Sequence, residues 1–192
     1  MGAKPKARPG GRSARVQQSV HQAVRELEAE QGRAALTVPL IAARADVTPS
    51  TIYRRWGDLQ QLLSDVAVER LRPEGPPADL GNLPDDLETW AVQWLEEMSS
   101  AAGRAYIQDA LAGDREGSNA GRCSAYAAEQ ITTLLCRAAE RGEPAPELDI
   151  VLDHLVAPMM YRILFRPGLL DPAYARHLTH TTLTQLTTAP RT

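Results

Sequence analysis

Residues 37–58 predict two short helices joined by a tight turn. Thr37 is suited to cap a helix that has Pro39 in its first turn, because proline lacks the N–H that a first turn would leave unpaired. We expect this helix to stop at Asp46, since aspartate tolerates the left-handed backbone conformation that a sharp turn requires. Thr48 can then cap a second helix. The pattern is that of a helix-turn-helix unit.

The second predicted helix carries a face that suits the major groove of DNA. Ile52 and Trp56 are four positions apart and are expected to face the core. The remaining side chains are small, hydroxyl-bearing or cationic, namely Pro49, Ser50, Thr51, Tyr53, Arg54 and Arg55. Arginine in a major groove commonly reads guanine through two hydrogen bonds. The sequence therefore indicates a helix that enters double-stranded DNA.

The run 34–56, followed by 62–63, resembles the DNA-binding domain of TetR-family transcriptional regulators. The remainder of the chain, including 141–143 and 157–162, resembles the helical C-terminal domain of that family. The resemblance implies an all-α fold, in which an N-terminal three-helix helix-turn-helix domain is joined to a larger helical ligand-binding and dimerisation domain.

Two positions depart from the usual pattern of the family. Asp46 stands where a turn glycine is common, and Leu59 stands where a lysine usually begins the fourth helix. In the family that lysine lies near a DNA phosphate. Leucine at this position implies one fewer charge-assisted contact per subunit and a shallower dependence of affinity on salt.

The resemblance also implies roles for individual side chains. Base edges are the expected targets of Pro49, Ser50 and Arg54, and Arg44 on the preceding helix is able to reach a base. Phosphates are the expected targets of Thr48, Thr51 and Tyr53. The complete set of expected DNA contacts comprises Arg8, Arg12, Thr37, Arg44, Thr48, Pro49, Ser50, Thr51, Tyr53, Arg54 and Arg55.

Charge is divided unevenly along the chain. Residues 1–72 contain twelve Lys or Arg against seven Asp or Glu, whereas residues 73–192 contain nine against seventeen. The basic excess lies in a Gly- and Pro-rich leader over 1–15 without an acidic residue, which predicts a disordered arm. Arg8 and Arg12 are candidates for contacts in an A·T-rich minor groove, and a solvated tail is the alternative.

Helical spacing of apolar residues recurs along the chain, and strand signals are absent. A support helix is expected from Ser13 to Gly32, and Pro158 is expected to kink an apolar helix over 148–165. A Pro- and Gly-rich segment follows the fourth predicted helix and is expected to join two domains. The first domain is therefore expected to span 16–72 and the second 73–192.

The last two predicted helices are candidates for a four-helix interface between two copies of the chain. A homodimer would place paired recognition helices on a palindromic site about 34–36 Å apart. An intrachain core is the alternative for each of the apolar residues involved, which are Val151, Leu155, Met159, Ile163, Leu178 and Leu186.

Large side chains of the second domain are candidates for an apolar pocket with polar tips, as in small-molecule sites. They comprise Trp90, Trp94, Tyr106, Tyr126, Met160, Tyr161 and Phe165. Ordinary core packing is the alternative for each. In the family picture a small-molecule effector binds there, moves the fourth helix and spreads the recognition helices, so that a repressor releases its operator.

Other classes of function lack support in the sequence. No nucleophile elbow or phosphate-binding loop is present, and His177 and His180, three positions apart, lack a third metal ligand at a suitable spacing. We therefore expect neither an enzyme nor a bound metal or cofactor. Cys123 and Cys136 lie thirteen positions apart on one predicted helix, about 20 Å, too far to bridge. Without a secretory leader or long apolar run, the protein is expected in the cytoplasm, away from membranes.

Two alternatives to a DNA-binding regulator stay open at this point. The first is a helical sensor or protein-interaction module that has lost DNA binding, because Leu59 replaces a basic residue and residues 16–72 carry seven basic against seven acidic side chains. Salt-dependent binding to duplex DNA would separate the two cases. The second is a small helical enzyme that uses the aromatic pocket, for which no catalytic constellation is apparent.

Overall fold

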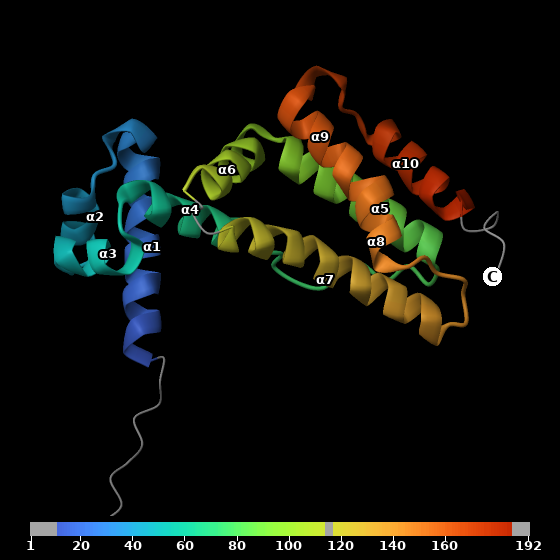
Figure 1. Cartoon of the computed structure of the whole chain (residues 1–192), viewed down its shortest axis with the longest axis horizontal. Coiled ribbons are helices and arrows are strands. Elements are labelled where there is room, and N and C mark those ends of the chain that lie inside the picture. Colours follow the sequence, from blue (N-terminus) through green and yellow to red (C-terminus); the bar gives the residue numbers. More distant parts are fainter. Residues whose placement is uncertain (1–10, 114–116, 186–192) are drawn as a thin grey trace, which may run out of the picture.

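The computed structural model describes residues 11–113 and 117–185, and this part of the chain is helical without a strand (Figure 1). The principal helices are α1 Gly11–Gln31, α2 Val38–Arg44, α3 Pro49–Trp56, α4 Leu59–Arg70, α5 Leu83–Ser99, α6 Ala101–Ala112, α7 Ser118–Glu140, α8 Leu148–Val151, α9 Ala157–Phe165 and α10 Pro172–Gln185. Short 3₁₀ turns occupy Arg33–Ala35 and Pro167–Leu169, and a π-helical turn occupies Leu152–Val156. The predicted all-α class is confirmed.

The helices form two packed groups, which α4 connects (Figure 1). Helices α1, α2 and α3 share a core with α4, to which Leu62, Leu63 and Val66 contribute. Other residues of α4 pack on α6, where Ala67 and Val68 meet Ala110. The larger core gathers side chains from α5, α7, α9 and α10. Helix α4 therefore belongs to both groups.

Local signals fix the helix-turn-helix as the sequence predicted. The Thr37 hydroxyl accepts a hydrogen bond from the Leu40 N–H at 3.3 Å, which caps α2. Asp46 has a φ of 54°, in the left-handed region, and ends the turn between α2 and α3. At α4, the Asp58 carboxylate accepts from the Gln61 N–H at 2.9 Å.

Thr48 differs from the prediction. It stands at the start of α3 in extended backbone, but its side chain makes no capping bond. Its hydroxyl instead lies 2.9 Å from the Ser50 Oγ and 3.0 Å from the Thr51 Oγ1. The neighbouring hydroxyls compete successfully with the backbone N–H groups, so three polar side chains gather at the beginning of α3.

Helix α1 begins at Gly11, so residues 11–15, which were predicted to belong to a disordered arm, are helical. The reason is a tertiary contact. Arg55 donates to the Ser13 carbonyl oxygen at 3.1 Å and to the Ser13 Oγ at 2.6 Å, which holds this first turn against α3. Arg8 and the side chain of Arg12 lie outside the described residues.

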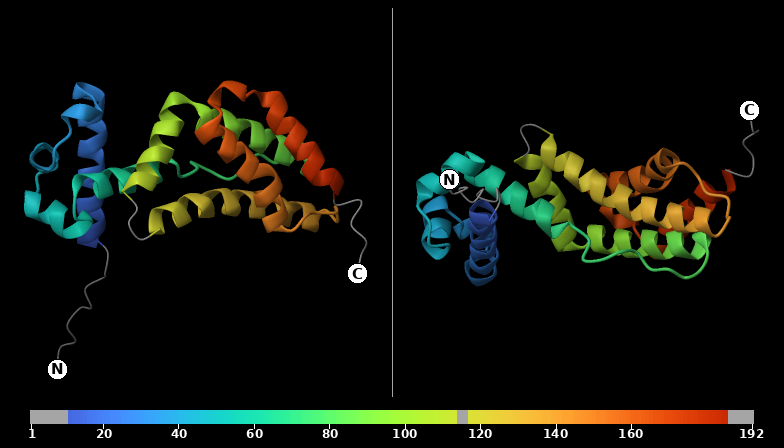
Figure 2. Two further views of the ribbon diagram at one scale, coloured as in Figure 1. Left: turned by 45° about the horizontal axis from the view of Figure 1, so that its top comes forward. Right: turned by 90° about the horizontal axis from the view of Figure 1, so that it is seen from below.

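In the larger domain α10 packs along α5, and the α8–α9 helix runs beside α5 and α7 (Figure 2). The kink predicted at Pro158 takes the form of the π turn Leu152–Val156. Ala157 donates its N–H to the Leu152 carbonyl oxygen, five residues back. This wider turn accommodates the proline ring and its missing N–H without ending the helix.

Helices long and apolar enough to span a membrane do not occur among the described residues.

Candidate DNA-binding surface and ligand cavity

Helix α3 divides into a buried and an exposed side, as predicted. Ile52 is fully buried and Trp56 is 6% exposed, and both belong to the core of the N-terminal domain. Tyr53, at 50% exposure, lies on the opposite side. Ser50 and Arg54 are exposed as well, along with Pro49, Thr48 and, in part, Thr51. An exposed face of this kind on an accessible helix can meet the edges of bases and the phosphates beside them.

Arg54 and Arg55 are neighbours with different surroundings. Arg55 binds Ser13, donates to the Gln17 Oε1 at 2.6 Å and stacks 5.1 Å from the centre of the Trp56 ring. Arg54 makes no hydrogen bond or ion pair with the residues that the structure describes. Arg55, predicted as a DNA contact, is thus engaged in holding α3 to α1, and Arg54 is the cation that α3 presents to solvent.

Arg44 is also engaged with α1. Its guanidinium donates to both carboxylate oxygens of Glu30, at 2.9 and 2.7 Å, and lies 3.4 Å from Glu26. The hydrogen bonds from Arg44 lower the pKa of Glu30 below its ordinary value, and the same pairing raises the pKa of Arg44. A base contact by Arg44 would require this bidentate pair to open, because the fork-shaped guanidinium is already matched to a carboxylate.

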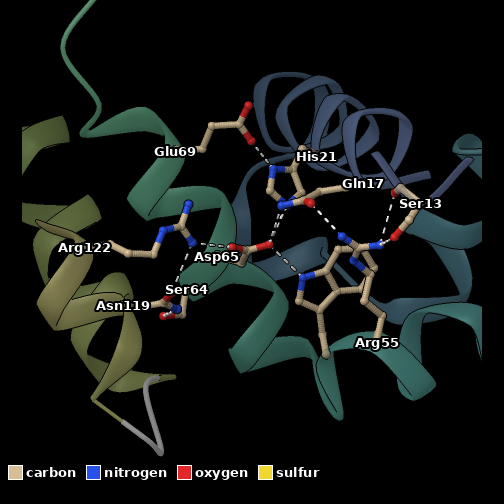
Figure 3. A network of polar contacts seen from close by, with 10 residues as sticks. Ser13, Gln17, His21, Arg55, Ser64, Asp65, Glu69, Asn119 and Arg122 are labelled. Atoms are coloured by element: carbon tan, nitrogen blue, oxygen red, sulfur yellow. Dashed lines mark hydrogen bonds and ion pairs between the residues drawn. The ribbon is translucent and has the colours of Figure 1, made fainter. Parts of the chain in front are cut away.

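A carboxylate that the sequence analysis did not single out connects the elements behind α3 (Figure 3). Asp65 of α4 accepts hydrogen bonds at its Oδ2 from the indole N–H of Trp56 at 2.9 Å and from the Gln17 amide at 3.0 Å. The Nε2 of His21 lies 3.0 Å from the same oxygen, and Arg122 of α7 donates to Oδ1 at 2.8 Å. Its signal in the sequence is a lone carboxylate within the apolar run of α4.

The surroundings of Asp65 favour its charged form. Burial alone would raise the pKa of this carboxyl, but the hydrogen bonds from His21, Trp56 and Arg122 outweigh burial and hold the pKa well below its ordinary value. His21 is itself fully buried, and its Nδ1 contacts the carboxylate of Glu69 one turn further along α4. The charged Asp65 therefore ties α1, α3, α4 and α7 together.

A cavity of about 1070 Å³ lies between the larger domain and α4, and Arg25 of α1 also lines it. Its walls come from α4 to α7, from the π turn and α9, and from the loop after α4. Four of the residues predicted for a pocket line it, namely Trp90, Trp94, Tyr126 and Met160. The two tryptophan rings are stacked with their centres 5.9 Å apart. These four side chains border the cavity, and their role in binding an effector stays a prediction.

Three predicted pocket residues lie elsewhere. Tyr106 packs beside Ala67 and Val68, and Arg70 lies 5.8 Å from the centre of its ring. Tyr161 and Phe165 are 56% and 69% exposed and are absent from the cavity wall. Successive residues of a helix point about 100° apart, so Met160 can face the cavity while its neighbour Tyr161 faces solvent.

The residues predicted for a dimer interface are mostly in the core of the single chain. Val151, Leu155, Met159 and Ile163 have no exposed surface, so they cannot contact a second copy as the molecule stands. The α8–α9 helix is apolar on several sides, and its most regular stripe packs on neighbouring helices of its own chain. Leu178 is partly buried against the same core, and Leu186 lies outside the described residues.

Comparison with known proteins agrees with this architecture. Residues 77–182 match the family described as tetracyclin repressor-like, C-terminal domain, and residues 22–66 match the tetR family of bacterial regulatory proteins. The HTH-type transcriptional regulator YdeS of Bacillus subtilis is 27% identical over 167 residues, which cover 80% of each chain. The regulator AqdR of Rhodococcus erythropolis is 32% identical over 68 residues, covering 35% of this chain and 33% of that protein.

Solved structures share the fold. The TetR-family regulator SCO0332 has a TM-score of 0.65 at 22% identity and covers 92% of this chain and 99% of that chain. FadR of Thermus thermophilus, a transcriptional repressor solved in complex with lauroyl-CoA, has a TM-score of 0.58 at 16% identity, with coverage of 92% and 96%. The helix-turn-helix with its exposed α3 and the match over more than half of the chain show that this protein belongs to the TetR family of DNA-binding transcriptional regulators.

Proposed function

We propose that the protein is a homodimeric repressor that leaves a palindromic operator when a small molecule occupies the cavity of the larger domain. One observation carries this proposal. Helix α4 supplies Glu69 and Arg70 to the cavity wall, and the same helix holds α3 through the bond between Asp65 and Trp56. A ligand that prefers one position of α4 would thereby change the affinity for DNA.

Among the candidate DNA contacts, Arg54 is the best placed to read a base. It is exposed on α3 and is not committed to another described side chain, whereas Arg44 and Arg55 are held by α1. In this proposal Pro49 and Ser50 contact the edges of bases. Hydrogen bonds to phosphates come from the hydroxyls of Thr37, Thr48, Thr51 and Tyr53. Arg8 and Arg12 remain candidates for the minor groove.

The outer face of α9 is proposed as the contact with a second copy. Tyr161 and Phe165 lie one helical turn apart on this face, with ring centres 5.3 Å apart, and are largely exposed in the single chain. Large exposed aromatic side chains mark contact sites more often than solvated surface. This pair replaces the residues first predicted for the interface, which the core of the chain already buries.

The effector is proposed to be a largely apolar molecule with a ring that stacks on Trp90 or Trp94. The wall also contains Met98, Leu152 and Met160, whose flexible or branched side chains adapt to an apolar ligand. A volume of about 1070 Å³ lies at the upper end of the range for small-molecule pockets, about 300–1,000 Å³. The size of the cavity and the stacked tryptophans therefore support a bulky ligand with a ring, and Arg70, Glu97 and Asp153 in the same wall can bind a polar group on it.

Selection of bound sequences from random duplexes tests the DNA-binding part of the proposal. The full-length protein should enrich a palindrome. If the enriched sequences have A·T pairs beside the half-sites, removal of residues 1–10 should abolish that preference. Arg54→Ala should relax the sequence preference by about 1–3 kcal/mol at one position of each half-site. Arg176→Ala, on the distant helix α10, is the control.

Two outcomes would count against parts of the proposal. Equal affinity of Arg54→Ala for all operator variants would remove Arg54 from the base contacts. If no duplex is enriched and binding does not fall with salt, a sensor that has lost DNA binding becomes the better description. Release of the selected operator by an apolar aromatic compound, lost in Trp94→Ala, would support the effector site.

A further inference from the structure

The two groups of helices are joined by a set of polar contacts around the middle of α4 (Figure 3). Arg122 of α7 donates to the Asp65 Oδ1 at 2.8 Å. One turn earlier on α7, Asn119 donates to the Ser64 Oγ at 2.7 Å, and that hydroxyl donates in turn to the Ala110 carbonyl oxygen at 2.6 Å. Consecutive residues of α4 thus contact α6 and α7.

Asp65 differs from an ordinary surface partner because its two oxygens serve different parts of the molecule. Oδ1 faces Arg122 of the larger domain, while Oδ2 accepts from Trp56 at the end of α3 and from Gln17 and His21 of α1. The Asp65 side chain is 16% exposed, and that of Arg122 is 44% exposed. Because both oxygens belong to one partly buried carboxylate, loss of the Arg122 contact at Oδ1 is expected to change the hydrogen bonds that Oδ2 accepts.

The helix that carries Arg122 also forms the cavity wall. Cys123 and Tyr126 of α7 line the cavity directly after Arg122. Glu69 of α4 lines the same cavity and contacts His21. A shift of α7 that makes room for a ligand would therefore move the Arg122 guanidinium relative to Asp65.

We infer that Arg122 is a positioning residue for DNA recognition, which acts through Asp65 to fix the recognition helix α3 on the larger domain. This inference extends the proposed function, and its expected effect on binding to a palindrome rests on that proposed function. Arg33 also contacts Asp109 of α6 across the two groups, but that contact reaches the 3₁₀ turn after α1 rather than α3. Arg122 instead bonds to Asp65, and the same carboxylate accepts the hydrogen bond from the indole of Trp56.

Trp56 offers a direct readout of this connection. The chain contains three tryptophans, so a ¹⁵N-labelled sample should give three indole N–H signals, and Trp56→Phe identifies the one that reports on Asp65. In Arg122→Gln we expect the Trp56 signal to shift and its exchange with solvent to quicken, while the signals of Trp90 and Trp94 change little. Arg122→Lys should return the Trp56 signal toward its wild-type position, because the charge is kept.

Arg176→Gln is the matched control. Arg176 forms an exposed pair with Glu88 at 3.3 Å between α10 and α5, so the same substitution removes a comparable ion pair without contacting α4. The inference is overturned if the Trp56 signal has the same position in Arg122→Gln as in Arg176→Gln. Because Arg122 lies at the surface, loss of folding is not the expected result, and the Trp90 and Trp94 signals check that the larger domain is intact.

Operator spacing tests the consequence for DNA. The full-length wild type should bind its selected palindrome better than versions with one base pair inserted or deleted at the centre. In Arg122→Gln this discrimination should shrink by about 3- to 10-fold, since residues that couple two sites typically change the coupling by that order. Unchanged discrimination would contradict the inference, whereas a wild type without any spacing preference would instead contradict the proposed dimer.

Discussion

Asp46 sits in the left-handed backbone region at the turn between α2 and α3, where the family often has glycine. Aspartate tolerates this conformation better than most side chains, because its short polar group can bond locally. The turn directs Val47 back against the N-terminal core and brings α3 out at the angle that exposes its face. A departure from the family pattern at this residue is therefore compatible with the same geometry.

Substitution of Asp46 should reveal the cost of this backbone conformation. Asp46→Ala should lower the free energy of unfolding by about 1 kcal/mol, because alanine lacks the local bonding that makes a positive φ tolerable. Asp46→Gly should stay close to wild type. Urea unfolding at one fixed protein concentration measures both, and equal stability of the alanine and glycine variants would show that the turn is not strained.

Asp65 predicts a specific pH dependence of stability. Its pKa in the folded protein lies below the ordinary value of 3.8, so the folded state favours the charged carboxylate. The stabilisation is then complete above the pKa of the unfolded chain, about 3.9, and is lost as the pH falls below it toward the folded pKa. Urea unfolding between pH 6 and pH 2.5 should show this decline.

Asp65→Asn is the variant that checks this assignment. It should be less stable than wild type near neutral pH and should lose stability less steeply below pH 4, because the amide does not titrate. Asp149→Asn, on the exposed surface of α8, is the control and should keep the wild-type slope. A wild-type slope in Asp65→Asn would mean that other carboxylates cause the acid sensitivity.

Helix α4 packs on both groups of helices, and the proposed response to a ligand depends on this helix. Its contact with α6 is close: a Cβ atom added at Gly113, at the end of α6, would overlap the Gln60 carbonyl oxygen and lie 2.7 Å from the Ser64 Cβ. The absence of a side chain at Gly113 allows the Ser64 hydroxyl to reach the Ala110 carbonyl oxygen. Small residues thus set the distance between α4 and α6.

Gly113→Ala should force α6 away from α4. We expect a loss of about 1–3 kcal/mol in the free energy of unfolding, the usual cost of adding a methyl group to a packed contact. Gly121→Ala on α7 is the control, because its Cβ would meet open space, and a gain of about 0.4–1 kcal/mol is expected there. If thermal unfolding ranks the two variants equally, the α4–α6 contact is looser than the structure indicates.

At the scale of the whole molecule, the N-terminal group presents α3 at one end, and the outer face of α9 lies on the larger domain (Figure 1). A dimer formed through that face would present two copies of α3 to DNA, and paired half-sites bind a palindrome far better than one. The assembly, rather than the single chain, would then set the spacing between the recognition helices.

Charged residues on the outer face of α9 should separate the copies. The double substitution Tyr161→Glu and Phe165→Glu is expected to give a monomer at micromolar concentration, because two carboxylates would be buried without partners at the contact. Sedimentation analysis measures the mass, with Leu80→Glu, an exposed apolar residue in the loop before α5, as the control. A wild-type protein that is already monomeric would contradict the proposed dimer.

The helix-turn-helix was predictable from the sequence, because its signals act over a few residues. The cap at Thr37, the left-handed Asp46 and the Asp58 cap each depend on backbone groups within four positions, and the spacing of Ile52 and Trp56 selects the buried side of α3. Such signals are readable without knowing how distant helices pack.

Tertiary packing decided the contacts between residues that are far apart in the sequence. The sequence did not reveal that α1 supplies partners to Arg44 and Arg55, which stay candidates for DNA contacts. The apolar stripe of α8–α9 fits a core as well as a dimer until the neighbouring helices are placed. Asp65 collects donors from α1, α3 and α7, up to 57 positions away in the chain. Partners so distant in sequence meet because folding buries apolar faces together, and periodicity identifies such faces without saying which of them will meet.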